Sequence, residues 1–203
     1  MAKEKNLIII FTRNPELGKV KTRLAKTIGD KSALNIYTFL LNHTKNVTQN
    51  LDCDKAVYYS EKIRDNDIWN ETIYQKHLQS GNNLGEKMHN AFEHTFFKGY
   101  KKVIIVGSDL FDLEPEHINK AFSQLDKNDV VIGPAKDGGY YLLGMKALHS
   151  QVFKNKSWGT STVLQDTLQD FNKIDVHLLE ELNDIDVYDD IKNIETLKQL
   201  IKE

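Results

Sequence analysis

The segment LGKVKTRLAK, residues 17–26, places Lys19, Lys21 and Arg23 close together, shortly after the apolar run at residues 7–11. The whole chain has 27 Lys and Arg residues against 29 Asp and Glu residues, so this cluster does not reflect a basic composition. It follows an expected buried strand and opens an expected helix, which is where α/β proteins bind phosphates. Solvated side chains on a helix are the alternative, but their grouping favours a bound anion.

The loop before this cluster lacks the pattern of a Walker A phosphate-binding loop. That pattern needs a glycine five residues before the Gly-Lys pair and a serine or threonine after it, but Arg13 and Val20 occupy these positions. Side-chain cations would therefore do the work that backbone amides do in a P-loop. The predicted nucleotide contacts from this region are Thr12, Arg13, Gly18 and Lys19, and Lys21 and Arg23 are predicted to be catalytic, together with Asp109.

A second stretch, VIIVGSDLFDL at residues 103–113, brings a carboxylate to the same edge of the sheet. Its β-branched run ends at Gly107, and Asp109 follows where a buried parallel strand would end. A carboxylate beside nucleotide phosphates is repelled unless a divalent cation lies between them. Mg²⁺ or Mn²⁺ would suit such a site, so we predict that Asp109 is a metal ligand. Capping of the next turn is the alternative.

A third stretch, GPAKDGGYYLLGM at residues 133–145, carries two adjacent glycines between strand-like segments. Gly138 and Gly139 permit a tight turn or a close approach of the backbone to a ligand, because neither has a Cβ atom. A plain hairpin would explain the glycines as well. Asp137 in the same loop is a candidate for binding an acceptor.

A fourth stretch, LNDIDVYDD at residues 182–190, is rich in carboxylates. Asp184 and Asp186 would point the same way on an extended segment, and could then share a metal ion with Asp109. An acid-rich helix start is the alternative.

Composition limits the classes of function. A chain of 203 residues suits one α/β domain over residues 1–203, and a net charge of −2 gives no field that would hold nucleic acid. Cys53 is the single cysteine, so an internal disulfide or a cysteine-based zinc site is excluded. The first apolar run is too short for a signal peptide or a membrane span, which leads us to expect a cytoplasmic protein.

Short apolar runs alternate with longer segments of helical period, the pattern of a mostly parallel sheet covered by helices on both faces. The expected strands are residues 7–11, 55–60, 101–109, 129–134, 139–145 and, more weakly, 177–184. The expected helices are residues 19–28, 31–49, 84–98, 115–125, 160–171 and 188–202.

Six stretches together resemble a known family. They are FTRNPELGKVKTRLAKTIG, NLGEKMHNAF, VIIVGSDLFDL, GPAKDGGYYLLGM, WGTSTVLQDTL and DIDVYDDI, in this order. They look like a largely uncharacterised bacterial family of the GT-A-like nucleotide-diphospho-sugar transferase superfamily, related to phospholactate and molybdenum-cofactor guanylyltransferases. The resemblance spans nearly the whole chain and implies a Rossmann-like three-layer sandwich of GT-A type, whose mixed sheet has one antiparallel strand.

The resemblance also implies roles for residues. It implies a nucleotide over the first half of the sheet, a divalent metal on Asp109, and a second acidic ligand from Asp184 or Asp186. Lys21 and Arg23 match the KxRL stretch of the guanylyltransferases by position. With these matches, the predicted nucleotide contacts also include Gly85 and Ser108, and the predicted acceptor contacts are Asp137, Gly138, Gly139, Tyr140 and Trp158.

The sequence departs from the family pattern at three places. Arg13 stands where relatives commonly have lysine. Leu110-Phe111 replaces the usual Cys-Pro, which would reshape the pocket, and Val187-Tyr188 replaces a usual Thr-Pro. The last change leaves both Asp184 and Asp186 as candidate metal ligands.

Three functions are compatible with these residues. The first is nucleotidyl transfer from an NTP to a small phosphorylated or sugar-like acceptor with release of pyrophosphate, and the basic segment favours it because pyrophosphate leaves with a large charge. The second is glycosyl transfer from a nucleotide-diphospho-sugar, which the general label of the family favours. The third is a nucleotide-binding domain without catalytic activity.

Overall fold

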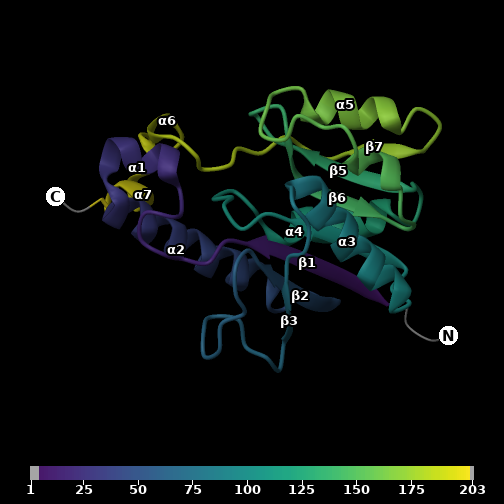
Figure 1. Ribbon diagram of the computed structural model, residues 1–203, viewed down its shortest axis with the longest axis horizontal. Coiled ribbons are helices and arrows are strands. Elements are labelled where there is room, and N and C mark those ends of the chain that lie inside the picture. Colours follow the sequence, from purple (N-terminus) through teal and green to yellow (C-terminus); the bar gives the residue numbers. More distant parts are fainter. Residues whose placement is uncertain (1–4, 202–203) are drawn as a thin grey trace.

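A seven-stranded sheet with helices on both faces frames the structure, a computed structural model that describes residues 5–201 (Figure 1). The strands are β1 (Asn6–Thr12), β2 (Asp54–Tyr59), β3 (Tyr74–Leu78), β4 (Lys102–Val106), β5 (Val130–Pro134), β6 (Tyr140–Met145) and β7 (Val176–Leu178). The helices are α1 (Thr22–Ile28), α2 (Asp30–Thr48), α3 (Leu84–Phe97), α4 (Pro115–Gln124), the 3₁₀ helix η1 (Ser150–Phe153), α5 (Val163–Asp170), α6 (Tyr188–Ile191) and α7 (Glu195–Lys198).

The strand directions bring several loops to one edge of the sheet. The strand order is β3-β2-β1-β4-β6-β5-β7, and β1 is parallel to both of its neighbours, β2 and β4. β6 is antiparallel to β4 and β5, which makes the sheet mixed, as the sequence predicts. Because β6 runs the opposite way, its first residue lies at the same edge as the last residues of β1 and β4.

Residues of the central strands alternate between two hydrophobic cores, one on each face of the sheet. In β1, Ile8 and Ile10 pack with residues of α2 and α4, whereas Leu7 and Ile9 pack with residues of α3 and η1. This is the period of two that an extended chain imposes on side chains covered on both faces. The predicted three-layer α/β class is therefore confirmed.

A third, smaller hydrophobic cluster fixes the C-terminal segment. Its buried members are Leu24, Ile36, Leu40, Ile185, Ile191 and Leu197. They come from α1, α2, α6, α7 and the segment before α6, and Figure 1 shows the short helices α1, α6 and α7 gathered near the C-terminal end of the chain. The cluster therefore places the acidic residues before α6 next to the segment that carries Lys21.

Two helix predictions were wrong in their extent. The helix expected at residues 19–28 begins at Thr22, because Lys21 has left-handed backbone angles of φ 48° and ψ 42°. The helix expected at 188–202 is divided into α6 and α7, because the Ile194 amide bonds to the Ile191 carbonyl (2.9 Å), a tightened turn that ends α6. Residues 202–203 lie outside the described part of the chain.

Two elements were missed and three were shorter than predicted. β3 has the polar sequence YQKHL on the sheet edge, and η1 is a single turn, so neither carries a long apolar run. β4 ends at Val106, β7 spans Val176–Leu178 and so covers only residues 177–178 of the expected 177–184 segment, and α5 begins at Val163. No helix in the described residues is both long and apolar enough to cross a membrane.

Candidate active site

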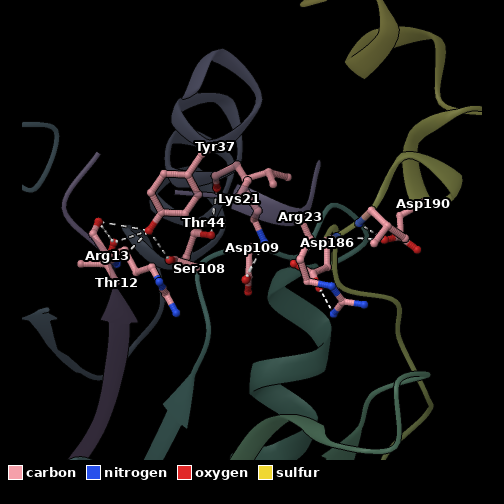
Figure 2. A network of polar contacts seen from close by, with 12 residues as sticks. Thr12, Arg13, Lys21, Arg23, Tyr37, Thr44, Ser108, Asp109, Asp186 and Asp190 are labelled. Carbon is pink, nitrogen blue, oxygen red and sulfur yellow. Dashed lines mark hydrogen bonds and ion pairs between the residues drawn. The ribbon is translucent and has the colours of Figure 1, made fainter. Parts of the chain in front are cut away.

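The carboxyl ends of β1 and β4 are joined by a buried tyrosine (Figure 2). The Tyr37 hydroxyl, from α2, lies 3.2 Å from Thr12 Oγ1 and 3.3 Å from Ser108 Oγ. It also accepts a hydrogen bond from the Arg13 amide (2.8 Å) and donates one to the Arg13 carbonyl (3.1 Å). Burial raises the pKa of Tyr37, so the hydroxyl stays neutral and holds the two strand ends in one position.

Lys21 reaches into the centre of the site. Its Nζ lies 2.8 Å from Asp109 Oδ2, and its side chain is only 6% exposed, against 37% for Asp109. A buried ammonium is stable only with such a partner. The left-handed backbone of Lys21 is uncommon outside glycine, and strained residues of this kind concentrate at functional sites.

A second ion pair lies beside the first (Figure 2). Arg23 pairs with Asp186, and the Asp190 carboxylate accepts hydrogen bonds from the backbone amides of Asp186 (2.9 Å) and Val187 (2.7 Å). Arg13 extends into the same region, is exposed, and has no acidic partner in the described part of the chain. The loop and α1 therefore contribute both paired and unpaired cations.

The segment before α6 crosses the end of β4 and brings a further carboxylate to Asp109. Leu110 and Asp184 form an antiparallel bridge, and the Ile185 amide donates to the Asp109 carbonyl at 3.0 Å. Burial, with repulsion from Asp109 and Asp137, raises the pKa of Asp184 to about 6. Asp184 and Asp186 line two different cavities, which adjoin at Asp109.

Two adjoining cavities meet at Asp109. The first, which we call the basic chamber, encloses about 860 Å³, and its charged and polar lining includes Thr12, Arg13, Asn14, Lys19, Lys21, Arg23, Glu61, Gln79, Lys87, Ser108, Asp109 and Asp186. The second, which we call the acidic chamber, encloses about 220 Å³, and its lining includes Asp109, Asp137, Gly139, Tyr140, Trp158 and Asp184. Phe11, Leu84, Gly107, Asp109 and Gly159 line both.

The structure thus gathers most of the predicted site residues, in two groups that match the predicted division. The predicted cations, Thr12, Ser108 and Asp186 line the basic chamber, and the predicted acceptor residues Asp137, Gly139, Tyr140 and Trp158 line the acidic one. Asp184 lies with the second group. Their roles in binding stay predictions.

Three predicted glycines lie outside the linings of both chambers. Gly18, in the turn before Lys19, has φ 73°. Gly138 has φ 87°, and a Cβ atom there would lie 2.3 Å from the Ser161 carbonyl oxygen, so it closes the hairpin against the segment before α5. Gly85 is buried, and a Cβ atom there would lie 2.4 Å from the Phe153 carbonyl oxygen and 2.7 Å from the Trp158 ring. Gly85 therefore makes room for Trp158 over the start of α3.

Sequence reasoning missed several residues of the site. Tyr37 lies on a helix with an ordinary apolar period, so nothing distinguished it from core. Asn14 is buried and accepts hydrogen bonds from the backbone amides of Glu61 (3.0 Å) and Lys62 (3.3 Å), which ties the loop after β1 to the loop after β2. Gln79 follows β3, the strand that was not predicted, and donates to the carbonyls of Thr12 and Tyr58.

The chain matches a family of bacterial proteins. Residues 43–160 match the family described as uncharacterized protein conserved in bacteria (DUF2064). A 2-phospho-L-lactate guanylyltransferase from Methanocaldococcus jannaschii is 29% identical over 136 residues, which is 64% of this chain and 56% of that protein. The chain therefore spans just over half the length of this relative.

Solved structures share the fold. A protein from Desulfovibrio desulfuricans G20, provisionally named a nucleotide-diphospho-sugar transferase, superposes with a TM-score of 0.84 at 30% identity, covering 98% of this chain and 94% of that one. The 4-diphosphocytidyl-2C-methyl-D-erythritol synthase of Anaerococcus prevotii DSM 20548 superposes with a TM-score of 0.60 at 13% identity, over 97% and 96% of the two chains. The second likeness concerns the fold alone.

Proposed function

From the premise that the chain belongs to the DUF2064 family of bacterial proteins, we propose that it is a metal-dependent nucleotidyltransferase. It transfers the nucleotidyl group of an NTP to a small acceptor and releases pyrophosphate. The observation that carries this proposal is the composition of the basic chamber, where Arg13, Lys19, Lys21 and Arg23 converge on one cavity of about 860 Å³ beside Asp109. A cavity of this size suits a nucleotide, and its cations suit a triphosphate.

Two relatives support a transferase that uses a nucleotide. The protein of M. jannaschii is a guanylyltransferase by name, and the protein of D. desulfuricans is named for nucleotide-diphospho-sugars. Both names fit a chain whose site carries cations on one side of Asp109 and a smaller cavity on the other. The donor goes to the basic chamber and the acceptor to the acidic chamber in this proposal.

The ion pairs of the site are matched to the charges of the donor. Lys21 neutralises Asp109, and Arg23 neutralises Asp186. Phosphate oxygens compete for both cations, and Asp109 then loses its partner while Asp184 still lies beside it. This crowding of carboxylates is the electrostatic situation that a divalent cation relieves.

The residues present suit Mg²⁺ or Mn²⁺, which also take ligands from water and substrate. They suit less well a metal ion whose ligands all come from the protein. No cluster of three or more His, Cys, Asp or Glu side chains that could hold a metal occurs among the described residues. Mg²⁺ is usually bound through one or two carboxylates, with water and substrate phosphates completing its shell. We propose Asp109 and Asp184 as its protein ligands, and the bound ion would supply charge stabilisation for the phosphates.

The protein's own residues account for the rest of the mechanism. An acceptor hydroxyl oxygen in the acidic chamber forms a bond to the α-phosphorus as its proton passes to a carboxylate of that chamber. The bond from that phosphorus to the bridging oxygen breaks, and pyrophosphate leaves. Lys21 and Arg23 stabilise the negative charge that grows on the departing pyrophosphate. Tyr37 fixes Thr12 and Ser108 around the donor, so positioning supplies much of the rate.

Glycosyl transfer is the second candidate, because the relative from D. desulfuricans is named for nucleotide-diphospho-sugars. In that reaction the acceptor attacks the anomeric carbon, and a nucleoside diphosphate leaves. The products distinguish the two reactions. We expect purified protein with Mg²⁺, an NTP and an acceptor mixture to release pyrophosphate. Release of UDP or GDP from sugar nucleotides, without pyrophosphate from any NTP, would instead establish glycosyl transfer.

A further inference from the structure

The two chambers have opposite charge. Asp109, Asp137 and Asp184 are the charged side chains that line the acidic chamber, and its described lining contains no Lys, Arg or His. The basic chamber is lined by five cations, which are Arg13, Lys19, Lys21, Arg23 and Lys87. A phosphorylated molecule therefore has cationic partners on one side of Asp109 and no cationic side chain in the described lining on the other.

The walls of the acidic chamber are largely apolar. They include Phe11, Met88, Leu143 and Val163, together with Trp158. Trp158 is held in place by Gly85, whose missing side chain makes room for the indole ring. The enclosed volume of about 220 Å³ is a quarter of that of the basic chamber, which suits a molecule with a single ring.

Besides tyrosine, threonine and tryptophan side chains, the chamber offers a carboxylate that accepts hydrogen bonds. The Asp137 carboxylate already accepts from the Gly139 amide at 2.8 Å, is exposed, and has capacity for further donors. A carboxylate pairs with the hydroxyl groups of a ligand, whereas it repels a phosphate. An aromatic ring offers a flat apolar surface for the carbon-bound hydrogens of a sugar ring.

From these observations we propose that the acceptor is an uncharged sugar or a similar cyclic polyol, and not its phosphate ester. The sugar ring packs against Trp158, and its hydroxyl groups donate hydrogen bonds to Asp137. This inference rests on the proposed function, of which it specifies the acceptor. It separates the two acceptor classes, phosphorylated and sugar-like, that the sequence leaves open.

The test measures binding in the acidic chamber alone. The protein contains two tryptophans, and Trp69 is buried outside both chambers, so its indole N–H signal in an ¹⁵N spectrum is an internal reference for that of Trp158. Saturating pyrophosphate first fills the basic chamber. Three matched pairs are then titrated, which are glucose and glucose 6-phosphate, ribose and ribose 5-phosphate, and inositol and inositol 1-phosphate.

We expect at least one uncharged compound to shift the Trp158 signal saturably, with its phosphate ester binding at least tenfold more weakly. Asp137→Lys should reduce this preference at least tenfold, whereas Asp65→Lys, at an exposed aspartate outside both chambers, should leave it unchanged. Tighter binding of the phosphate ester, or no shift of Trp158 by any uncharged member, overturns the inference.

Thermal stabilisation by NTPs with Mg²⁺, measured on the same samples, separates the two proposals. Stabilisation by an NTP together with failure of the sugars removes only the acceptor assignment. Absence of stabilisation by every nucleotide removes the proposed function itself, whatever the sugars do.

Discussion

Lys21 is the residue on which the proposed chemistry depends most. Its strained backbone and buried side chain place one ammonium between Asp109 and the basic chamber. In the structure this ammonium pairs with a carboxylate, and in the reaction it would pair with a phosphate instead. Helix α1 begins only at the next residue, so its packing does not account for the strained backbone of Lys21.

We predict that Lys21→Met lowers kcat/KM for pyrophosphate release by about 10²- to 10³-fold, the usual loss when one charge-stabilising group is removed. Lys26→Met serves as the matched control, because Lys26 is exposed on α1 outside both chambers. Steady-state kinetics on the two variants make the measurement. Equal activity of both variants would show that Lys21 has only a structural role.

At this scale the sequence was most informative where a charged side chain follows an apolar strand. Lys21, Arg23 and Asp109 were predicted for that reason, and they lie together. Tyr37 and Gln79 were not predicted, because a tyrosine on a helix face and a glutamine after a polar strand have no distinctive pattern. Their contribution depends on tertiary contacts with Thr12, which connect segments far apart in the sequence.

The elements around the site are fixed by local backbone requirements. The hairpin between β5 and β6 closes through Gly138, whose φ of 87° favours glycine and whose α-carbon lies against the Ser161 backbone. The hairpin itself was predictable from the two adjacent glycines. Its contact with the segment before α5 was not, because no local pattern records it.

We predict that Gly138→Ala lowers the free energy of unfolding by roughly 2 to 5 kcal/mol, since it combines a left-handed alanine with a clash against backbone. Gly99→Ala is the control, because Gly99 has a similar φ of 86° but open space where its Cβ atom would lie. The control should cost only about 1 to 2 kcal/mol. Urea denaturation of both variants measures the difference, and equal losses would contradict the steric argument.

The segment before α6 depends on Asp190. This carboxylate accepts hydrogen bonds from the amides of Asp186 and Val187 and from the Asn183 side chain (3.1 Å). Burial alone would raise the pKa of Asp190, but these donors hold it below its usual value. The ionised form therefore stabilises the fold at neutral pH.

We predict that Asp190→Ala lowers the free energy of unfolding by about 1 to 3 kcal/mol at pH 7, because two partly buried amides lose their acceptor. The folded pKa lies below the unfolded value of about 3.9, so the gap to wild type should shrink as pH falls below about 4. Asp189→Ala removes only an exposed pair with Lys192 and should cost less than about 0.5 kcal/mol. A gap that persists unchanged down to pH 2 would contradict this account.

Across the whole molecule, the strand order explains why the two chambers adjoin. β1 and β4 are neighbours, so the loops that follow them meet, and antiparallel β6 starts at the same edge with the turn that carries Asp137 before it. The alternation of short apolar runs with helices predicted the layers of this arrangement. It could not predict the division of helix 188–202, because the packing of Ile185, Ile191 and Leu197 against α1 and α2 decides how that segment folds.

The most direct test of the account is a thermal-shift panel of NTPs and sugar nucleotides, each with Mg²⁺, Mn²⁺ or EDTA, on wild type and Asp109→Asn. A ligand at 100 times its Kd adds about 2.7 kcal/mol, which for a chain of this size corresponds to roughly 5 to 11 °C. We predict such a shift for at least one NTP with metal in the wild type, and its loss both with EDTA and in Asp109→Asn. No shift with any nucleotide, or a shift that is the same without metal and without the Asp109 carboxylate, would contradict the central claim that Asp109 joins a metal-dependent nucleotide site.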